Sequence, residues 1–328
     1  MKKITFLFYA IFSVLAANAQ KKQNTYFLKD NGKEVELKDS ADYIRIIQEP
    51  DSGETNFVVQ EFYTNGKRKA VGKASSFEPK LVYEGLYVGY HKNGKKQCSS
   101  FYEKGISVGK AFYFFEDGTL QKEIEYLPKD AVNSKSTELN LTPSFKLVYQ
   151  ADSLGEVFVQ EGNGHLIDYS IVDKDSLIEE GNYKEGFKDG VWNGKYASGK
   201  SSYVETYNAT KFVSGVTTVG DQTIEYTILE KAPEFKGGVN KFYKYLANTI
   251  RYPRDAAKNN VTGTVILSFT IEKDGTPTNI EVKRSVYKSV NEEAIRVIKS
   301  SPRWTPATQR GLPVRVKYNI PITFSLGR

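Results

Sequence analysis

A repeated arrangement of tyrosine and glycine limits what the first two thirds of this chain can fold into. Two segments, YEKGISVGKAFYFFEDGT from Tyr102 and YKEGFKDGVWNGKYASGK from Tyr183, share one frame without a gap: Tyr-x-x-Gly, three residues, Gly, eight residues, Gly. Partial copies lie upstream, in FYTNGK from Phe62 and YHKNGK from Tyr90. Turn residues between short aromatic runs predict a series of successive β-hairpins.

The glycines of these segments are predicted to close the turns. Asn-Gly and Asp-Gly between alternating aromatic runs favour type I′ turns, in which both central residues have positive φ. Repeats of roughly 20 to 30 residues cannot bury a face alone, so we expect them to stack into an elongated antiparallel sheet. The Tyr and Phe stripes are expected to fill and flank that sheet, with an aromatic ligand platform as the alternative. The polar run LPKDAVNSKSTELNLTPS, from Leu127, is expected to loop between two blocks of repeats.

Charge separates the chain near Leu229. Residues 230–328 hold 18 Lys and Arg against 8 Asp and Glu, a net charge of +10, whereas residues 20–229 hold 26 against 31, a net charge of −5. Two regions of opposite charge predict two domains with different surfaces. The basic residues form no stripe, so we expect acidic protein or lipopolysaccharide surfaces, and no nucleic acid, as partners.

The N-terminus has the three-part pattern of a secretory signal. Lys2 and Lys3 precede an apolar run that ends at Ala17, and the small residues Ala17 and Ala19 flank Asn18. This run is shorter than the roughly 20 apolar residues that a membrane-spanning helix needs. We therefore predict a signal peptide over residues 1–19, cleaved after Ala19, with a retained inner-membrane anchor as the alternative.

Few residues suit catalysis or cofactor binding. His91 and His165 are the only histidines and neither has a metal-ligand spacing, while the single cysteine, Cys98, cannot form an internal disulfide. Gly237-Gly238 could cradle an anion before a helix, but no Lys-Ser or Lys-Thr follows it. No enzyme activity, catalytic residue, cofactor, metal site or small-molecule substrate is predicted.

The last hundred residues begin with a helical pattern. Val239, Phe242, Leu246 and Ile250 recur at helical spacing after a Gly pair, which predicts a helix with one apolar face. Pro253 ends that helix and can open the next turn.

A hairpin pattern follows this helix. From Thr264 the apolar residues alternate with a period of two as far as Glu272, and Asp274-Gly275 then turns the chain. Ile280 and Val282 carry the returning strand.

A second helix and a last strand complete this region. Ser289-x-x-Glu292 is typical of a capping box at the start of a helix that Pro302 closes. Apolar residues then alternate without a break from Val314 to Leu326. The predicted fold class is α+β: a C-terminal three-stranded antiparallel sheet with two helices, preceded by an all-β repeat domain, a meander of β-hairpins.

The C-terminal pattern resembles the TonB C-terminal domain family. The segments that carry the resemblance occur in family order: APEFKGG at Ala232, YP at Tyr252, GTVILSFTIEKDG at Gly263, NEEAIRVIKSSPRWTPA at Asn291 and GLPVRVKYNIPITFSL at Gly311. The frame between about Asn56 and Val216 resembles MORN repeats of the antitoxin-like variety, which implies a structural or interaction module. We therefore predict a MORN-like repeat domain over residues 20–222 and a TonB C-terminal-like domain over residues 223–328.

The resemblance to TonB implies a function. Known members couple an inner-membrane proton-driven motor to outer-membrane receptors and grip a short receptor segment as an added strand. We therefore expect a periplasmic protein, able to form a homodimer, that binds an outer-membrane TonB-dependent receptor or another envelope protein in support of transmembrane transport. Unlike a well-studied transducer, this chain has no long proline-rich stretch, since its 11 prolines are spread out. A non-energised scaffold of the cell envelope is the alternative.

The predicted binding surface is the edge of the last strand. Proline cannot donate to a strand ladder and is tolerated mainly at edges, so Pro321 suggests an edge strand. Basic side chains on an exposed edge can also serve to block aggregation, which is the alternative to binding. The family resemblance favours pairing with a receptor peptide, with the basic side chains favouring acidic sequences. The candidate residues are Val314, Arg315, Val316, Lys317, Tyr318, Asn319, Ile320 and, in the YP pair, Tyr252.

Overall fold

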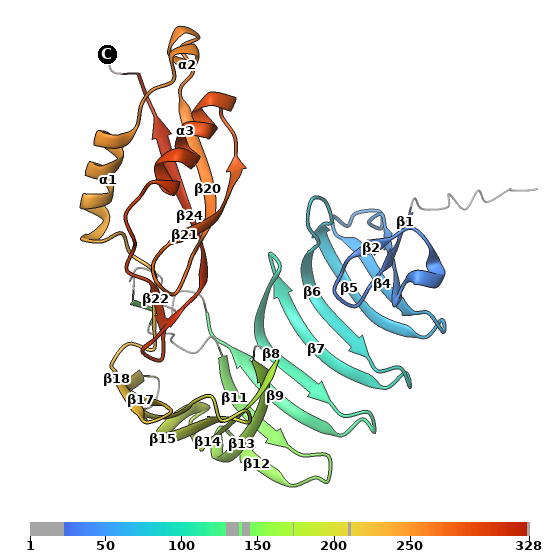
Figure 1. Cartoon of the computed structure of the whole chain (residues 1–328). Helices are drawn as coiled ribbons and strands as arrows, with labels where there is room; N and C mark the ends of the chain where they lie inside the picture. Colours follow the sequence, from blue (N-terminus) through green and yellow to red (C-terminus); the bar gives the residue numbers. More distant parts are fainter. Residues whose placement is uncertain (1–22, 129–137, 140–144, 173, 209–210, 327–328) are drawn as a thin grey trace, which may run out of the picture. The chain divides into compact units, whose positions relative to one another are not determined.

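The computed structural model describes residues 23–128, 138–139, 145–172, 174–208 and 211–326 (Figure 1). The predicted signal peptide and most of the predicted loop after Leu127 lie outside the described residues. The chain divides into two compact units, the first formed by residues up to 107 with 114–118, and the second by residues 108–113 with 119 onward.

The first unit contains an antiparallel meander. Its elements are β1 (Gln23–Leu28), β2 (Glu34–Val35), the short 3₁₀ helix η1 (Lys38–Ser40), β3 (Tyr43–Gln48), β4 (Phe57–Tyr63), β5 (Arg68–Ser76), β6 (Val82–Tyr90) and β7 (Lys96–Glu103). Strands β3 to β7 pair in chain order, and β1 pairs with both β2 and β3.

The second unit contains a further meander, which we call the second meander. Strand β8 (Ile106–Phe114) has residues in both units, and the strands that follow are β9 (Leu120–Tyr126), β10 (Glu138–Leu139), β11 (Phe145–Ala151), β12 (Val157–Gln160), β13 (Asn163–Val172), β14 (Asp175–Lys184), β15 (Phe187–Tyr196), β16 (Ser202–Asn208), β17 (Lys211–Val219) and β18 (Gln222–Tyr226). The second meander is formed by β9 and β11 to β18, which pair antiparallel in that order. The prediction of an all-β region built from hairpins is confirmed.

The turns of the meanders differ from the prediction. In Asn65-Gly66 only the glycine has positive φ, and the Gly66 N–H donates to the Tyr63 carbonyl at 2.8 Å, so this Asn-Gly turn is not type I′. Four residues separate β4 from β5, and connections of that length are built on type I turns. Type I′ geometry occurs instead in the two-residue turns Lys104-Gly105 and Glu185-Gly186, where both residues have positive φ.

Pairs of a glycine and a facing aromatic residue pack the second meander. A Cβ added at Gly194 would lie 1.9 Å from the ring of Tyr203, so the glycine makes room for the ring of the neighbouring strand. The aromatic rings of three such pairs, those of Trp192, Tyr203 and Tyr226, are buried, which supports the prediction that such rings fill the sheet. The facing pairs are Gly181 with Trp192, Gly194 with Tyr203, and Gly215 with Tyr226.

The C-terminal region combines helices with two small sheets. Its elements are β19 (Glu230–Lys231), α1 (Gly238–Thr249), α2 (Arg254–Lys258), β20 (Gly263–Ile271), β21 (Pro277–Arg284), α3 (Lys288–Lys299), β22 (Ala307–Gln309), β23 (Leu312–Val314) and β24 (Val316–Phe324). Strands β21, β20 and β24 form a three-stranded antiparallel sheet, as predicted, and β20 lies in its centre. Strands β10, β19, β22 and β23 form the second sheet.

One hydrophobic core joins the helices to the three-stranded sheet. Four alternate residues of β20 are fully buried, and Trp304 contacts the rings of both Phe242 and Phe269. All three helices contribute to this core, which includes Phe242, Leu246, Ala256, Val265, Leu267, Phe269, Ile271, Val290, Ala294, Val297, Ile298, Trp304 and Ile322. Val239, predicted for the apolar face of α1, is instead 59 % exposed, because the buried face begins one turn later at Phe242.

The start of α3 corrects the predicted capping box. Helix α3 begins at Lys288, so Ser289 lies inside it, and its buried hydroxyl has no hydrogen-bond partner within the described residues. The side chain of Asn291 caps the preceding loop instead, accepting a hydrogen bond from the Val286 N–H at 3.2 Å and donating to Ser285 Oγ at 2.7 Å. The predicted box is therefore wrong, because the helix starts before its first residue.

The predicted unbroken last strand is two strands. Val314 pairs with Ala307 in the β22–β23 hairpin, whose two-residue turn is Arg310-Gly311, and β24 begins only after Arg315. The chain thus leaves one sheet and enters the other at Arg315. The short helix α2, with Pro253 as its N-cap, adds a third helix to the two predicted.

Candidate functional site: the edge of the C-terminal sheet

Strand β24 lies at one edge of the three-stranded sheet. It pairs with β20 in unbroken register, from Val316 opposite Ile271 to Phe324 opposite Gly263, and in the described part of the chain it pairs with no other strand. Its odd-numbered residues from Lys317 onward are exposed, and its even-numbered residues are half-buried or buried. Pro321 therefore lies on an edge strand, as the sequence predicts.

The position of Pro321 indicates which main-chain groups face the open edge. Pro321 stands opposite Ile266 in regular register although it has no N–H to donate. Proline is accommodated in a sheet where its nitrogen points away from the partner strand. In an antiparallel ladder the N–H and C=O of one residue point to the same side of the strand, and every second residue points to that side. The main-chain N–H and C=O groups of Lys317 and Asn319 therefore face the open edge, as the nitrogen and C=O of Pro321 do.

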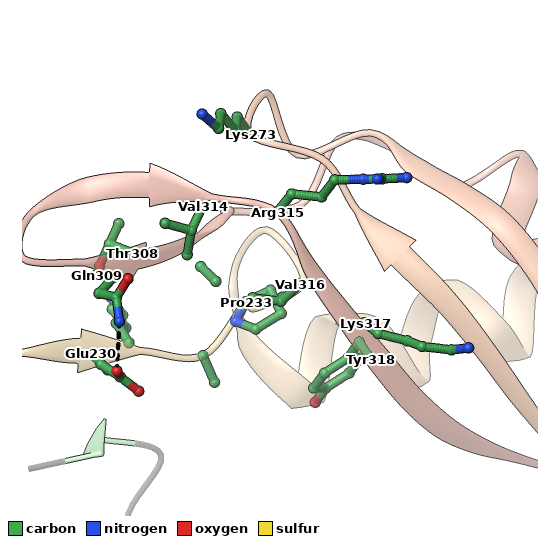
Figure 2. A pocket seen from close by; sticks show the side chains of 13 residues that line it. Glu230, Pro233, Lys273, Thr308, Gln309, Val314, Arg315, Val316, Lys317 and Tyr318 are labelled. Atoms are coloured by element: carbon green, nitrogen blue, oxygen red, sulfur yellow. Dashed lines mark hydrogen bonds between the residues drawn. The ribbon is translucent and has the colours of Figure 1, made fainter. Parts of the chain in front are cut away.

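A groove of about 660 Å³ lies beside the first half of β24. Figure 2 shows it between β24 and the chain around β19, β22 and β23, with Gln309 Nε2 donating to Glu230 Oε1 at 2.9 Å at one end and Lys317 and Tyr318 at the other. Apolar groups of Pro233, Val314 and Val316 line the wall between these ends. An extended chain running along β24 would therefore begin in a partly apolar groove with polar ends.

Both basic side chains at this edge have acidic neighbours. Arg315 Nε donates to Glu272 Oε1 at 3.0 Å, and Lys317 Nζ lies 3.7 Å from Glu281 Oε2. The pKa of Glu281 is lowered by its hydrogen bond with Lys283, and further by the charges of Lys283 and Lys317. These exposed pairs are weak and can exchange for other partners, so the edge is positively charged but partly neutralised.

The structure brings five of the eight predicted site residues together. Val314, Arg315, Val316, Lys317 and Tyr318 all line the groove. Asn319 and Ile320 continue along β24 beyond it. Tyr252 lies elsewhere: its ring packs edge-on against Phe324, at the far end of the strand, and its hydroxyl donates to the Val261 carbonyl.

Sequence reasoning missed the opposite wall of the groove. Thr308 and Gln309 come from the β22–β23 hairpin, while Lys231 and Pro233 come from the segment before α1. The backbone of Glu234 exchanges two hydrogen bonds with Thr305, which holds this segment beside the hairpin. The Arg310-Gly311 pair was the available signal, but its flanking strands of three residues are too short to show a period.

The histidines and the cysteine in the described part of the chain lie outside the groove. Among the described residues, no group of three or more His, Cys, Asp or Glu could hold a metal ion. His165 is exposed and bonds Asn182 and Glu180, and burial raises the pKa of the half-buried Cys98 thiol. No helix within the described residues has the length and apolar character to cross a membrane.

The C-terminal region is a small α+β domain with an open edge strand and a groove beside it. The family model described as the Gram-negative bacterial TonB protein C-terminal matches residues 248–326, which include α2, all three strands of the sheet and the β22–β23 hairpin. These residues are therefore a TonB C-terminal domain.

Among the solved chains that are similar to part of this protein is a TonB C-terminal domain. It is the solution structure of the TonB C-terminal domain of Helicobacter pylori, with 30 % sequence identity, covering 28 % of this chain and 87 % of that one at a TM-score of 0.22. No curated protein matches the chain. The family assignment rests on the family model.

Proposed function

We propose that this protein is a TonB-like envelope protein that binds an outer-membrane receptor, or another envelope partner, by adding the partner's extended segment to β24. The observation that carries the proposal is the open edge of β24, where the main-chain groups of Lys317 and Asn319 face away from β20. Hydrogen bonds to these groups would supply affinity, and the groove beside Val316 would take alternate side chains of the peptide.

The proposal includes an export route and a role for the repeats. Cleavage after Ala19 would release the chain into the periplasm, and the MORN-like meanders would serve as a spacer or a second interaction surface. Support for TonB-dependent transport belongs to the same proposal. The second candidate is a non-energised envelope scaffold, favoured by the apolar run that ends at Ala17, which is shorter than a membrane-spanning helix needs.

The proposed strand addition can be tested at one residue. Lys317→Pro removes a main-chain donor at the open edge, whereas the matched variant Lys317→Gln removes the charge and keeps the donor. With a synthetic peptide copying a short extended segment of an outer-membrane receptor of the same cell, we expect Lys317→Pro to weaken binding at least tenfold and Lys317→Gln to weaken it less. Equal affinities for Lys317→Pro and the unmodified protein, with β20 amide signals unchanged, would contradict pairing at this edge.

Growth separates the two candidate functions. In cells without other TonB-like proteins, deletion should abolish uptake of a scarce nutrient that needs active outer-membrane transport. Normal uptake after deletion would favour the scaffold. Sequencing of the mature N-terminus would show whether the chain begins at Gln20.

A further inference from the structure

Arg310, at the tip of the β22–β23 hairpin, is fixed against the second meander. Its backbone has a φ of +51°, an uncommon conformation for a residue with a side chain. The Arg310 N–H donates to the Leu229 carbonyl at 2.8 Å, and its carbonyl accepts a hydrogen bond from Thr217 Oγ1 on β17 at 2.9 Å. The side chain is only 20 % exposed, so main chain and side chain are both held.

The guanidinium of Arg310 is recognised on its edge and on its face. Nε donates to Glu205 Oε1 on β16 at 2.7 Å, and an Nη atom lies 3.5 Å from Glu179 Oε1 on β14. The guanidinium carbon lies 3.8 Å from the centre of the Tyr203 ring. A planar cation with donors along its edge suits this arrangement better than the compact ammonium of lysine.

The two carboxylates are held in place by the sheet itself. Glu205 is fully buried and accepts hydrogen bonds from the hydroxyls of Tyr207 and Tyr226, both at 2.9 Å. Glu179 accepts from the Tyr203 hydroxyl at 2.7 Å and from Lys188 at 2.9 Å. Burial alone would lower the pKa of Arg310, but attraction to Glu205 and its other partners outweighs burial, so the pKa is raised and the guanidinium stays charged.

A buried glutamate in the first unit provides an internal comparison. Glu61 is 3 % exposed and, like Glu205, stands two residues before a tyrosine. Its cations come from the adjacent strands of its own sheet: an Nη atom of Arg45 on β3 lies 2.6 Å away, and Lys69 on β5 lies 3.4 Å away. For Glu205, Arg310 is the only basic side chain within ion-pair distance in the described residues. A buried carboxylate without a cation is strongly unfavourable, and the cation that pairs with Glu205 comes from outside the strands of the second meander.

We propose that the surface around Glu205, Glu179 and Tyr203 is a binding site for an arginine at the tip of a β-hairpin, and that its partner is the C-terminal domain of the same chain. The opposite net charges of residues 20–229 and 230–328 favour this pairing. The β22–β23 hairpin continues through Arg315 into β24, so docking of Arg310 holds one wall of the groove beside β24. This proposal does not depend on what the edge binds.

Hydrogen exchange in the full-length protein tests the site. Arg310→Ala should raise exchange at the amides of residues 308–312 and 222–226 at least tenfold, while the amides of β20 keep their protection. The matched control Arg315→Ala removes an exposed arginine of the same segment and should leave residues 222–226 unchanged. In Arg310→Ala, 20 mM guanidinium should restore part of the protection, whereas 20 mM methylammonium should not.

Each remaining outcome also decides the proposal. Arg310→Lys keeps a positive charge near Glu205, and we expect it to raise exchange less than Arg310→Ala. If the amides of Arg310→Lys exchange hydrogen at the same rates as those of the unmodified protein, the site requires only a positive charge. That result would overturn the specific recognition of arginine. Failure of 20 mM guanidinium to restore protection in Arg310→Ala would also overturn the recognition of arginine. Protection of residues 308–312 that rises with protein concentration between 1 and 100 µM would assign the hairpin to a second copy, which overturns the assignment to the same chain.

Discussion

The backbone N–H of Trp304 donates to the carbonyl of Gly275 at 2.9 Å, so the loop after α3 crosses the turn between β20 and β21. Gly275 has a φ of +84°, and a Cβ there would lie 1.9 Å from the Trp304 carbonyl oxygen. The Trp304 ring in turn packs in the core against Phe235 and Phe269. This close backbone contact therefore fixes the large aromatic side chain that joins α1 to the sheet.

Gly275→Ala should destabilise the C-terminal domain. Positive φ costs a residue with a Cβ about 1–2 kcal/mol, and displacing the Trp304 backbone should add about 1–3 kcal/mol, as overpacking of a core does. The measurement is the free energy of opening at the amides of β20, from native-state hydrogen exchange. Gly238→Ala is the matched control, because Gly238 has a φ of +86° and a Cβ there would meet only the flexible end of Glu234, at 3.2 Å. Equal losses in the two variants would show that the Trp304 contact contributes nothing.

The sequence predicts long elements of this fold better than short ones. The period of two in β20 and β24 extends over nine residues each, enough to identify the strands and their exposed faces. Strands β22 and β23 have three residues each, so the hairpin that carries Arg310 leaves no periodic pattern. The Tyr and Gly frame predicts hairpins, but it does not show which glycine faces which ring, because that depends on the register between strands.

The edge strand of the candidate site could be predicted from the sequence, but the wall of the groove beside it could not. Alternation along β24 identifies the residues that point outward, and Pro321 identifies an edge. The ion pair between Arg315 and Glu272, which are 43 residues apart, and the groove wall from β22 depend on tertiary packing that no local pattern encodes.

Glu293 links α3 to the segment between α1 and α2, and its removal should be costly. The carboxylate accepts hydrogen bonds from the Arg251 N–H at 2.6 Å and from Arg296 Nε at 2.8 Å, while Arg296 also donates to the Thr249 carbonyl at 2.8 Å. We expect Glu293→Gln to lower the free energy of unfolding by about 1.5–3 kcal/mol, the range for hydrogen bonds to a charged group. The adjacent exposed residue gives the control: Glu292→Gln should change this free energy by less than about 0.5 kcal/mol. Similar losses for both variants would contradict a specific role for Glu293.

The same carboxylate predicts how the domain responds to acid. Burial alone would raise the pKa of Glu293, but hydrogen bonds from Arg296 and the Arg251 N–H outweigh it, so the folded-state pKa lies below the ordinary value of 4.5. The stabilisation is therefore complete above pH 4.5 and is lost as the pH falls through the folded-state pKa. We expect the penalty of Glu293→Gln to be full at pH 7 and smaller at pH 3, because part of the stabilisation by the carboxylate is lost once the pH falls below 4.5. Urea unfolding at the two pH values, followed through the NMR signals of the β20 amides, measures both penalties. An equal penalty at pH 7 and pH 3 would show that the effect of Glu293 comes from its shape and not from its charge.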